Sequence, residues 1–385
     1  MLINFNFFLI ILSFCLSLIN CENLNKEQVN DQISEFENKS INPFIEKVLI
    51  NYKEKYKKIN LNNETPLNNN LEVVICAIAK MENDYINDWC KYHLNMGFSE
   101  IYIFDNNDED YEPIENRIDK NIISKIHIFK VPGKQEKFQR ASYSLFTKYF
   151  NKNYNWCAYI DIDEFIVLKN WRNIKEFLNE SKFNNAEVIK LEWHIYGDND
   201  EIKQDISIPI YERITKETNS KFRIHQSKGI VRGNKEYLFT SSHFPSNIDE
   251  SYCNQVDING KSIKKKRFVA LSKRYEDAYI AHYMTKTLDE FMNQKFLRIE
   301  QNGANYKGNL MLSEDPYKRF TYYFKINQIT TEKVSYIKEK ININILNSKK
   351  LKQQYKKYKR KQKNKNIKKK IRKININKYE IIKNK

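Results

Sequence analysis

The chain has 385 residues, of which 41% are hydrophobic and 14% aromatic, so it can bury a sizeable core and is not a wholly disordered protein. Its net charge of +18 would favour nucleic acid or an acidic membrane as a partner if the charge covered the folded surface. Residues 349–385, however, contain 18 Lys or Arg against the single acidic Glu380, which leaves residues 1–348 close to neutral. No specific nucleic-acid partner is therefore expected, and the Lys-rich tail is interpreted as a solvated extension.

The N-terminal residues 1–21 form an apolar run, which we interpret as a signal peptide or an N-terminal membrane anchor. The run is near the lower length limit for a membrane-spanning helix, and Ile19-Asn20-Cys21 is a poor cleavage site, so both alternatives stay open. Either one predicts entry into the secretory pathway, in the ER or Golgi lumen, as a single-pass type II membrane protein or a secreted protein. The polar residues 22–70 are predicted to form a stem with one short helix around residues 44–56.

Residues 71–160 alternate between apolar runs typical of strands and segments with helical periodicity. Residues 71–79 form a continuous apolar, β-branched run, which predicts a strand buried on both faces. A helix is predicted from Asn83, acting as its N-cap, to Met96, with Gly97 ending it. Further strands are predicted at 101–104, 125–131 and 156–160, and a second helix at 134–150. This order predicts an α/β fold with a mostly parallel sheet.

Ligands of such a sheet bind beyond the carboxyl ends of its strands. The polar residues that follow the predicted strands directly are Lys80, Glu82, Asp105, Asp161 and Asp163. We expect them to converge on one rim of the sheet, which makes this rim the candidate functional site.

Asp161-Ile162-Asp163 follows the predicted strand at 156–160. Alternate residues of an extended chain point the same way, so Asp161 and Asp163 are expected to face one side and Ile162 the other. Two carboxylates this close repel each other unless a cation lies between them, and Mg²⁺ or Mn²⁺ bound by carboxylates and phosphates meets that need. The sequence therefore predicts a metal that neutralises a leaving diphosphate. The alternative is an acidic triplet in a surface loop, which the buried strand before it disfavours.

His282 lies where a predicted strand at 279–282 gives way to a helix beginning near Thr287. A neutral imidazole at such a strand end can complete the coordination of a metal. The alternative is a histidine that hydrogen-bonds within the core, which periodicity alone favours.

Four cysteines follow the apolar leader, and none of them has the paired spacing of a metal site. They are Cys76, Cys90, Cys157 and Cys253. Buried thiols are expected, although an oxidising lumen permits a disulfide.

Several motifs, taken as a set and in their order along the chain, resemble glycosyltransferases of family 92 and their family-2-like relatives. They are Cys76-Ala-Ile-Ala-Lys-Met-Glu-Asn83, Trp89-x-x-Tyr-His93, Tyr102-Ile-Phe-Asp-Asn-Asn107, Asp161-Ile-Asp-Glu-Phe165, Trp193-x-x-Tyr-Gly197, Glu212-Arg213, Lys228-x-x-x-Arg232, and His282-Tyr-x-x-Lys286 with Glu290-Phe291. The resemblance spans residues 71–300 and leaves the stem and the basic tail outside.

This resemblance implies a GT-A, Rossmann-like fold, with a mostly parallel central sheet, helices on both faces and an added β-rich acceptor region. It also implies a Mn²⁺ (or Mg²⁺) cofactor, a UDP-linked hexose as donor, and inversion of the anomeric carbon. By analogy, Asp161, Asp163 and His282 would hold the metal. The residues assigned to the nucleotide sugar are Lys80, Glu82, Asp105, Arg140, Asp161, Lys228 and Arg232.

An inverting transferase needs a carboxylate base near the acceptor hydroxyl. Asp198, which follows a predicted strand at 187–194, is the first candidate for this base, and Glu212 is the second. Trp193 suits stacking on a sugar face, although a core tryptophan is an equal alternative. Gln139 begins a helix whose outer face could meet the donor, but such residues are usually solvated, and His243 is given no role.

We therefore predict five segments: a leader (1–21), a stem (22–70), a catalytic domain (71–300), a helical or irregular extension (301–348) and a basic tail (349–385). The predicted function is metal-dependent transfer of a hexose from a nucleotide sugar to a glycan or glycoconjugate acceptor. Two alternatives remain, namely a non-catalytic lumenal carbohydrate-binding protein and another nucleotide-using transferase on a similar sheet. No glycine-rich phosphate loop follows the strand at 71–79, which disfavours P-loop and dinucleotide-binding proteins.

Overall fold

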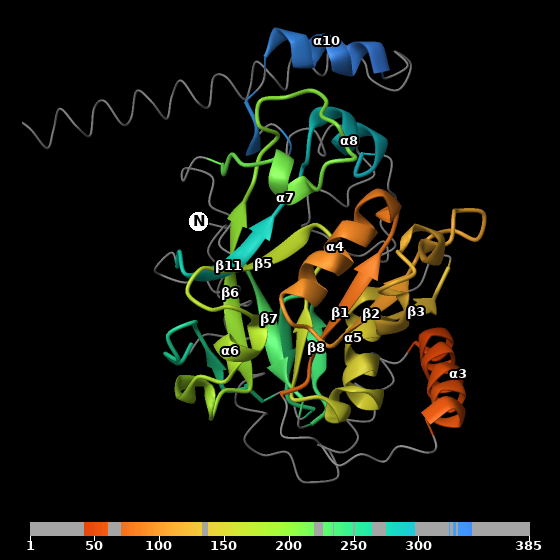
Figure 1. Ribbon diagram of the computed structural model, residues 1–385, viewed down its shortest axis with the longest axis vertical. Helices are drawn as coiled ribbons and strands as arrows, with labels where there is room; N and C mark the ends of the chain where they lie inside the picture. Colours follow the sequence, from red (N-terminus) through yellow and green to blue (C-terminus); the bar gives the residue numbers. More distant parts are fainter. Residues whose placement is uncertain are drawn as a thin grey trace, which may run out of the picture. The chain divides into compact units, whose positions relative to one another are not determined.

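The computed structural model describes residues 42–60, 71–132, 138–218, 226–233, 235–248, 251–263, 275–296, 323, 326–328 and 330–340 (Figure 1). The predicted leader and the basic tail lie outside the described residues. Across the part of the chain that the structure does describe, no helix has the length and hydrophobicity of a membrane span. The chain divides into two compact units. Unit 1 is Met1–Trp193, Ile224–His282 and Gln301–Ala304, and unit 2 is His194–Arg223, Tyr283–Glu300 and Asn305–Lys385.

The parallel half of the predicted sheet is confirmed in unit 1. β1 (Val73–Ala79) pairs in parallel with β2 (Glu100–Asp105) on one side and with β4 (Trp156–Tyr159) on the other. β3 (Ile126–Lys130) continues the sheet beyond β2, also in parallel, and Figure 1 shows β1, β2 and β3 side by side. Six of the seven β1 residues are buried, as expected for a strand that is covered on both faces.

Antiparallel strands extend this sheet beyond β4. They are β5 (Glu164–Leu168), β6 (Val188–Ile195), β7 (Ser227–Arg232) and β11 (Ala278–His282). β7 is antiparallel to both β4 and β6, and β11 is antiparallel to β5. Within the described residues the main sheet has nine strands in the order β3-β2-β1-β4-β7-β6-β11-β5, with β10 (Gln255–Val256) beside β6. The fold is therefore α/β with a mixed sheet, in which the antiparallel strands form the added β-rich region.

Two helices pack on one face of the parallel half. α3 (Pro43–Asn60) and α5 (Phe138–Tyr149) share a core cluster with β1, to which α3 contributes the fully buried Ile45 and Leu49. The predicted short helix before the catalytic domain is thus present, and it is part of the core of unit 1. The hairpin of β8 (Leu238–Ser241) and β9 (Phe244–Ser246) lies against α5.

The helix α4 (Asn83–Asn95) ends as predicted but begins differently. Gly97 follows it with φ +100°, a conformation that favours glycine. Asn83, however, is the first helical residue and not the cap, and its side chain bonds elsewhere: Nδ2 donates to Glu112 O at 2.7 Å, and Oδ1 accepts from Asn107 Nδ2 at 3.0 Å. Asn83 therefore ties the loop after β2 to the start of α4, a tertiary role that a local capping pattern does not distinguish.

The four cysteines beyond the leader are free and buried, which confirms the predicted thiols. Burial raises the pKa of each of them, so they are protonated and unreactive at neutral pH.

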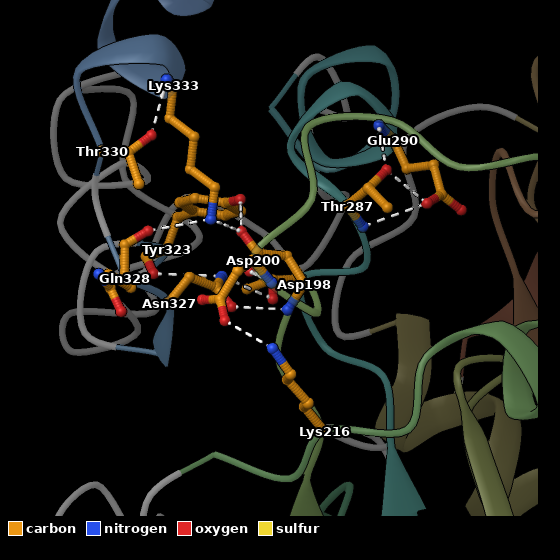
Figure 2. A network of polar contacts seen from close by, with 11 residues as sticks. Asp198, Asp200, Lys216, Thr287, Glu290, Tyr323, Asn327, Gln328, Thr330 and Lys333 are labelled. Carbon is orange, nitrogen blue, oxygen red and sulfur yellow. Dashed lines mark hydrogen bonds and ion pairs between the residues drawn. The ribbon is translucent and has the colours of Figure 1, made fainter.

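Unit 2 contains α7 (Ile210–Arg213), α8 (Leu288–Asn293) and α10 (Thr331–Lys340). Its small apolar cluster consists of Leu288, Phe291, Met292, Tyr323 and Ile337. The predicted helix near Thr287 is confirmed as α8, which begins with a reciprocal capping box. The Thr287 hydroxyl accepts from the Glu290 N–H, and a Glu290 carboxylate oxygen accepts from the Thr287 N–H at 3.1 Å (Figure 2).

The Glu290 carboxylate also binds Arg213 through both guanidinium ends, with Arg213 Nη1 at 2.9 Å from Glu290 Oε2. Burial acts to raise the pKa of Glu290, but Arg213 outweighs it and lowers the pKa to about 2. A carboxyl whose pKa falls on folding stabilises the fold above its unfolded pKa and loses this contribution as the pH falls through its folded pKa. We expect the free energy of unfolding to fall by about 2–3 kcal/mol between about pH 4.5 and pH 2. A lower urea midpoint would report this loss. Glu290→Gln should flatten this drop, and an unchanged profile in the variant would contradict the assignment.

Candidate active site

Lys80, Glu82 and Asp105 lie at the carboxyl ends of β1 and β2, which meet at one edge because the strands are parallel and Ala79 pairs with Asp105. Lys80 Nζ donates to Asn106 O at 3.2 Å, which ties the end of β1 to the loop after β2. The buried Asp105 carboxylate accepts the Asn107 N–H at 3.0 Å, and burial raises its pKa. Lys80 Nζ also pairs with Asp108 Oδ1 at 3.0 Å, so this edge carries a cation and two carboxyl groups.

Asp161 lies just beyond β4, and its carboxylate has three neighbours, all in unit 1. Its Oδ2 is 2.9 Å from Lys228 Nζ, and the Lys228 side chain is only 1% exposed. Its Oδ1 accepts from Gln139 Nε2 at 3.0 Å and from the Tyr143 hydroxyl at 3.4 Å. Desolvation acts to raise the pKa of Asp161, but the Lys228 ammonium outweighs it and lowers the pKa. Asp161 is therefore held as an anion.

The backbone after β4 forms a turn, not the extended chain expected from the sequence. The Glu164 N–H donates to Asp161 O at 3.0 Å, and the Asp161 N–H donates to Glu164 Oε2 at 3.1 Å. These hydrogen bonds close the loop on itself, so the expectation that Asp161 and Asp163 share one side of an extended chain is wrong. The two carboxylates have different partners instead.

Asp163 faces His282 of β11. The pairing of β11 with β5 places His282 opposite Glu164, one residue beyond Asp163. His282 Nε2 is 3.4 Å from Asp163 Oδ1, and its Nδ1 is 3.7 Å from Glu164 Oε1. All three side chains are buried, with at most 7% of each exposed. Burial raises the pKa of Glu164 well above its usual range, although the Lys228 ammonium acts in the opposite direction.

The Trp193 ring packs against His282, and His243 packs against Trp193 in turn. The ring centroids of Trp193 and His282 are 4.3 Å apart with an interplanar angle of 69°, and Trp193 packs in the same way against His243 at 5.1 Å. Burial, with the Lys228 ammonium nearby, lowers the pKa of His243 to about 3, so its ring is neutral. Since the Ser227 carbonyl can only accept, His243 Nδ1 donates to it at 3.1 Å. The Trp193 ring therefore contacts two imidazole rings, one of which is the candidate metal ligand His282.

The donor set can be tested for its fit to a divalent cation. Two ligand atoms that each lie about 2.1 Å from one ion, with an angle of about 90° at the ion, are about 3 Å apart. The distance of 3.4 Å between Asp163 Oδ1 and His282 Nε2 is close to this spacing. Carboxylate and imidazole also suit Mn²⁺ chemically. However, no three His, Cys, Asp or Glu side chains of the described residues gather into a ready-made metal site. Two predicted ligands therefore fit a common ion, while Asp161 is engaged by Lys228.

Arg140 and Arg232, both assigned to the nucleotide sugar, have other partners. Arg140 Nη1 donates to Thr240 O of the β8–β9 hairpin at 2.9 Å. Because β7 runs antiparallel to β4, Arg232 lies opposite Trp156 at the start of β4, while Lys228 lies at its end beside Asp161. The Arg232 guanidinium stacks over the Trp156 ring at 4.1 Å from its centroid. Lys228 therefore lies beside Asp161, while Arg232 lies at the opposite end of β4, and the assignment of Arg232 to the nucleotide sugar stays a prediction.

Asp198, the first candidate for the catalytic base, belongs to unit 2 and is enclosed there (Figure 2). Lys333 Nζ lies 2.6 Å from Asp198 Oδ2, and the Tyr323 hydroxyl donates to the same oxygen. The carboxylate is only 2% exposed, and burial raises its pKa although Lys333 and Tyr323 act in the opposite direction. Glu212, the second candidate, is exposed on α7. A catalytic role for either residue stays a prediction, and the contacts of Asp198 are those of a buried anchor.

Sequence reasoning gave Gln139 little weight and His243 no role, yet both lie at the site. Gln139 donates to Asp161, and His243 packs on the ring that supports His282. Neither residue belongs to a recognisable motif, so only the fold brings them there.

A mixed α/β sheet flanked by helices, with carboxylates and an imidazole at its strand ends, is consistent with a Rossmann-like glycosyltransferase fold. The sequence model of glycosyltransferase family 92 matches residues 69–306, which is more than half of the chain. The chain therefore belongs to glycosyltransferase family 92.

Two curated relatives are similar over shorter segments. A glycosyltransferase family 92 protein of Ricinus communis is 27% identical over 128 residues, which cover 33% of this chain and 23% of that protein. A second protein of this family, from Oryza sativa subsp. japonica, is 24% identical over 105 residues, which cover 27% of this chain and 18% of that protein. The matched segments thus span about a quarter or less of the length of these relatives.

Proposed function

We propose that the protein is a metal-dependent hexosyltransferase, which moves a hexose from a UDP-linked donor to a hydroxyl of a glycan or glycoconjugate, with inversion of the anomeric carbon. The observation that carries this proposal is the pairing of Asp163 with His282 at 3.4 Å, beside Asp161 and Lys228, beyond the end of β4. Membership of glycosyltransferase family 92 supports the reaction type. The uridine nucleotide, the hexose and the inversion rest on the resemblance of the motifs to that family.

Different residues of the site would bind different parts of the donor. In this proposal Lys80, Glu82 and Asp105 contact the nucleoside end of the donor, since they lie at the ends of the two neighbouring strands β1 and β2. The Lys228 ammonium binds the diphosphate, because a buried cation is a natural partner for phosphate oxygens. Asp163 and His282 hold a Mn²⁺ or Mg²⁺ ion, with Asp161 as the third ligand.

The bound ion would offset the negative charge that develops on the departing diphosphate. The protein's own residues do the rest. Lys228 adds a second positive charge to the same oxygens, and Trp193 holds the His282 ring in place. The bond between the anomeric carbon and the phosphate oxygen breaks as the acceptor oxygen forms its new bond and gives its proton to a carboxylate base. The sequence-based candidates for this base are Asp198 and Glu212, both of which belong to unit 2.

We also propose that the protein works in the lumen of the secretory pathway, as a secreted or membrane-anchored enzyme. The support is the apolar run of residues 1–21, which precedes a polar segment.

The proposal is tested by adding a panel of nucleotide sugars to the full chain, with and without Mn²⁺, and measuring both the melting temperature and the release of nucleoside diphosphate. We expect one UDP-sugar to raise the melting temperature by a few degrees and to be slowly hydrolysed, both only with the metal. The same donor should then support transfer when glycan acceptors are added.

Two results would redirect the interpretation. Stabilisation by free sugars, but by no nucleotide, would favour a carbohydrate-binding protein. Turnover of a nucleotide without release of a sugar would favour another nucleotide-using transferase. If no nucleotide sugar binds with any divalent cation, the proposed function is wrong.

A further inference from the structure

Lys228 is a buried cation that is held by the carboxylates of the candidate site. Its side chain is 1% exposed, its Nζ is 2.9 Å from Asp161 Oδ2, and it is 3.7 Å from Glu164 Oε2. Among the described residues its one hydrogen bond is the one to Asp161. Asp161 is therefore the carboxylate that Lys228 binds directly, while Glu164 lies beyond hydrogen-bond distance.

The Asp161 carboxylate is also a candidate ligand of the metal ion. Asp163 and His282 already lie at a spacing that suits one divalent ion, and Asp161 follows the same strand two residues before Asp163. A divalent ion bound by Asp163 and His282 would gain most from Asp161 as its next ligand. In the proposed function Asp161 is the third ligand of that ion, so Lys228 and the ion would compete for the same carboxylate.

We propose that Lys228 couples the binding of the metal to the binding of the donor diphosphate, by holding Asp161 until phosphate oxygens arrive and replace that carboxylate as its partner. The inference rests on the proposed function and deepens it, because it makes one lysine responsible for the order in which the site is filled.

A buried ammonium without a nearby anion is energetically unfavourable, and this cost falls on Lys228. If the ion took Asp161 in the absence of the donor, the Lys228 ammonium would stay buried without its partner, which is strongly unfavourable. A diphosphate brings at least two negative charges and several acceptor oxygens, so Lys228 can exchange one charge-assisted hydrogen bond for another. The metal then gains Asp161 at no such cost. Because free-energy coupling is reciprocal, the metal must also strengthen the binding of the diphosphate by the same factor.

The experiment measures the binding of Mn²⁺ alone, of UDP alone, and of each in the presence of the other, by titration calorimetry on the full chain. For the wild-type protein we expect UDP to tighten Mn²⁺ binding by about 10-fold or more, and Mn²⁺ to tighten UDP binding by the same factor. For Lys228→Met we expect Mn²⁺ alone to bind about 10-fold more tightly than to the wild type, UDP alone to bind more weakly, and the mutual effect to shrink to about threefold or less. These readouts do not depend on turnover.

Two control variants separate the coupling from a general loss of charge or of folding. Lys228→Arg keeps the buried cation, so most of the mutual effect should persist. Lys169→Met removes a lysine that is 49% exposed at the far end of β5, and it should match the wild type in all four titrations. Circular dichroism shows whether each variant is folded, and the wild-type coupling factor tests the inference even if Lys228→Met does not fold.

The inference fails separately from the proposed function. If Mn²⁺ and UDP both bind to the wild type but do not affect each other, or if Lys228→Met weakens Mn²⁺ binding, the coupling role is wrong while the transferase proposal stands. If UDP binds under no condition, both are wrong. If the mutual effect is present and is lost in Lys228→Met alone, Lys228 is the coupling residue.

Discussion

Replacing Lys333 by methionine is expected to lower the free energy of unfolding by about 3–5 kcal/mol, the largest stability change that we expect from a single substitution in unit 2. The Lys333 ammonium lies 2.6 Å from Asp198 Oδ2, with side-chain exposures of 1% and 2% (Figure 2). Methionine fills a similar volume but leaves the Asp198 carboxylate buried without a cation. The Tyr323 hydroxyl still donates to this oxygen, yet one neutral hydrogen bond does not offset a buried charge.

The loss should also depend on pH. Without Lys333, the pKa of Asp198 rises further above its usual range, since burial already raises it in the wild type. A group whose pKa is raised on folding stabilises the fold at low pH, and this contribution is lost as the pH rises through its folded pKa. The variant is therefore expected to be closer to the wild type at pH 5 than at pH 8. Urea unfolding at the two pH values measures both effects.

Lys216→Met provides a matched control in the same network. Lys216 forms its ion pair with Asp200 at 2.9 Å, but the two side chains are 63% and 49% exposed, so the loss should be within about 1 kcal/mol (Figure 2). The double variant Asp198→Asn/Lys333→Met removes both buried charges and should recover part of the loss. Equal losses in the two lysine variants would contradict the role of burial in this prediction.

The parallel half of the sheet could be predicted because its signals are local. An apolar, β-branched run specifies β1, and the helical spacing of Tyr85, Ile86, Trp89 and Cys90 specifies α4, whose buried face they form. Asp161 could also be placed beyond the end of a buried strand. These features depend on neighbours within a few residues, where periodicity and turn chemistry carry the information.

The partners within the site could not be predicted, because they come from distant parts of the chain. Lys228 is 67 residues from Asp161 and reaches it only because β7 runs antiparallel beside β4. The five-residue motif from Lys228 to Arg232 suggested one shared role, but the strand direction places the two residues at opposite ends of β4. The sequence made Asp198 the first candidate for the catalytic base and did not reveal its ion pair, since the Lys333 cation lies 135 residues further on. Charge partners at such separations leave no local pattern.

Asp163→Asn is expected to reduce the rate of hexose transfer by at least about 100-fold, because the loss of one ligand charge removes several kcal/mol of stabilisation from the departing diphosphate. The substitution keeps the shape of the side chain, so the fold should persist, with a melting temperature within a few degrees of the wild type. Asp277→Asn makes the same change in an exposed residue just before β11 and should leave the rate unchanged.

This substitution also distinguishes the two kinds of cation in the site. Asp163 contacts His282, whereas the Lys228 ammonium lies on Asp161 and Glu164. Asp163→Asn should therefore weaken Mn²⁺ binding by about 10-fold or more while UDP alone binds nearly as well as to the wild type. If the variant instead loses UDP and keeps Mn²⁺, Asp163 contacts the donor and not the metal. If it keeps its full rate of transfer, the metal does not bind at Asp163, and catalysis rests on other residues near this strand end, among them the buried Lys228 ammonium.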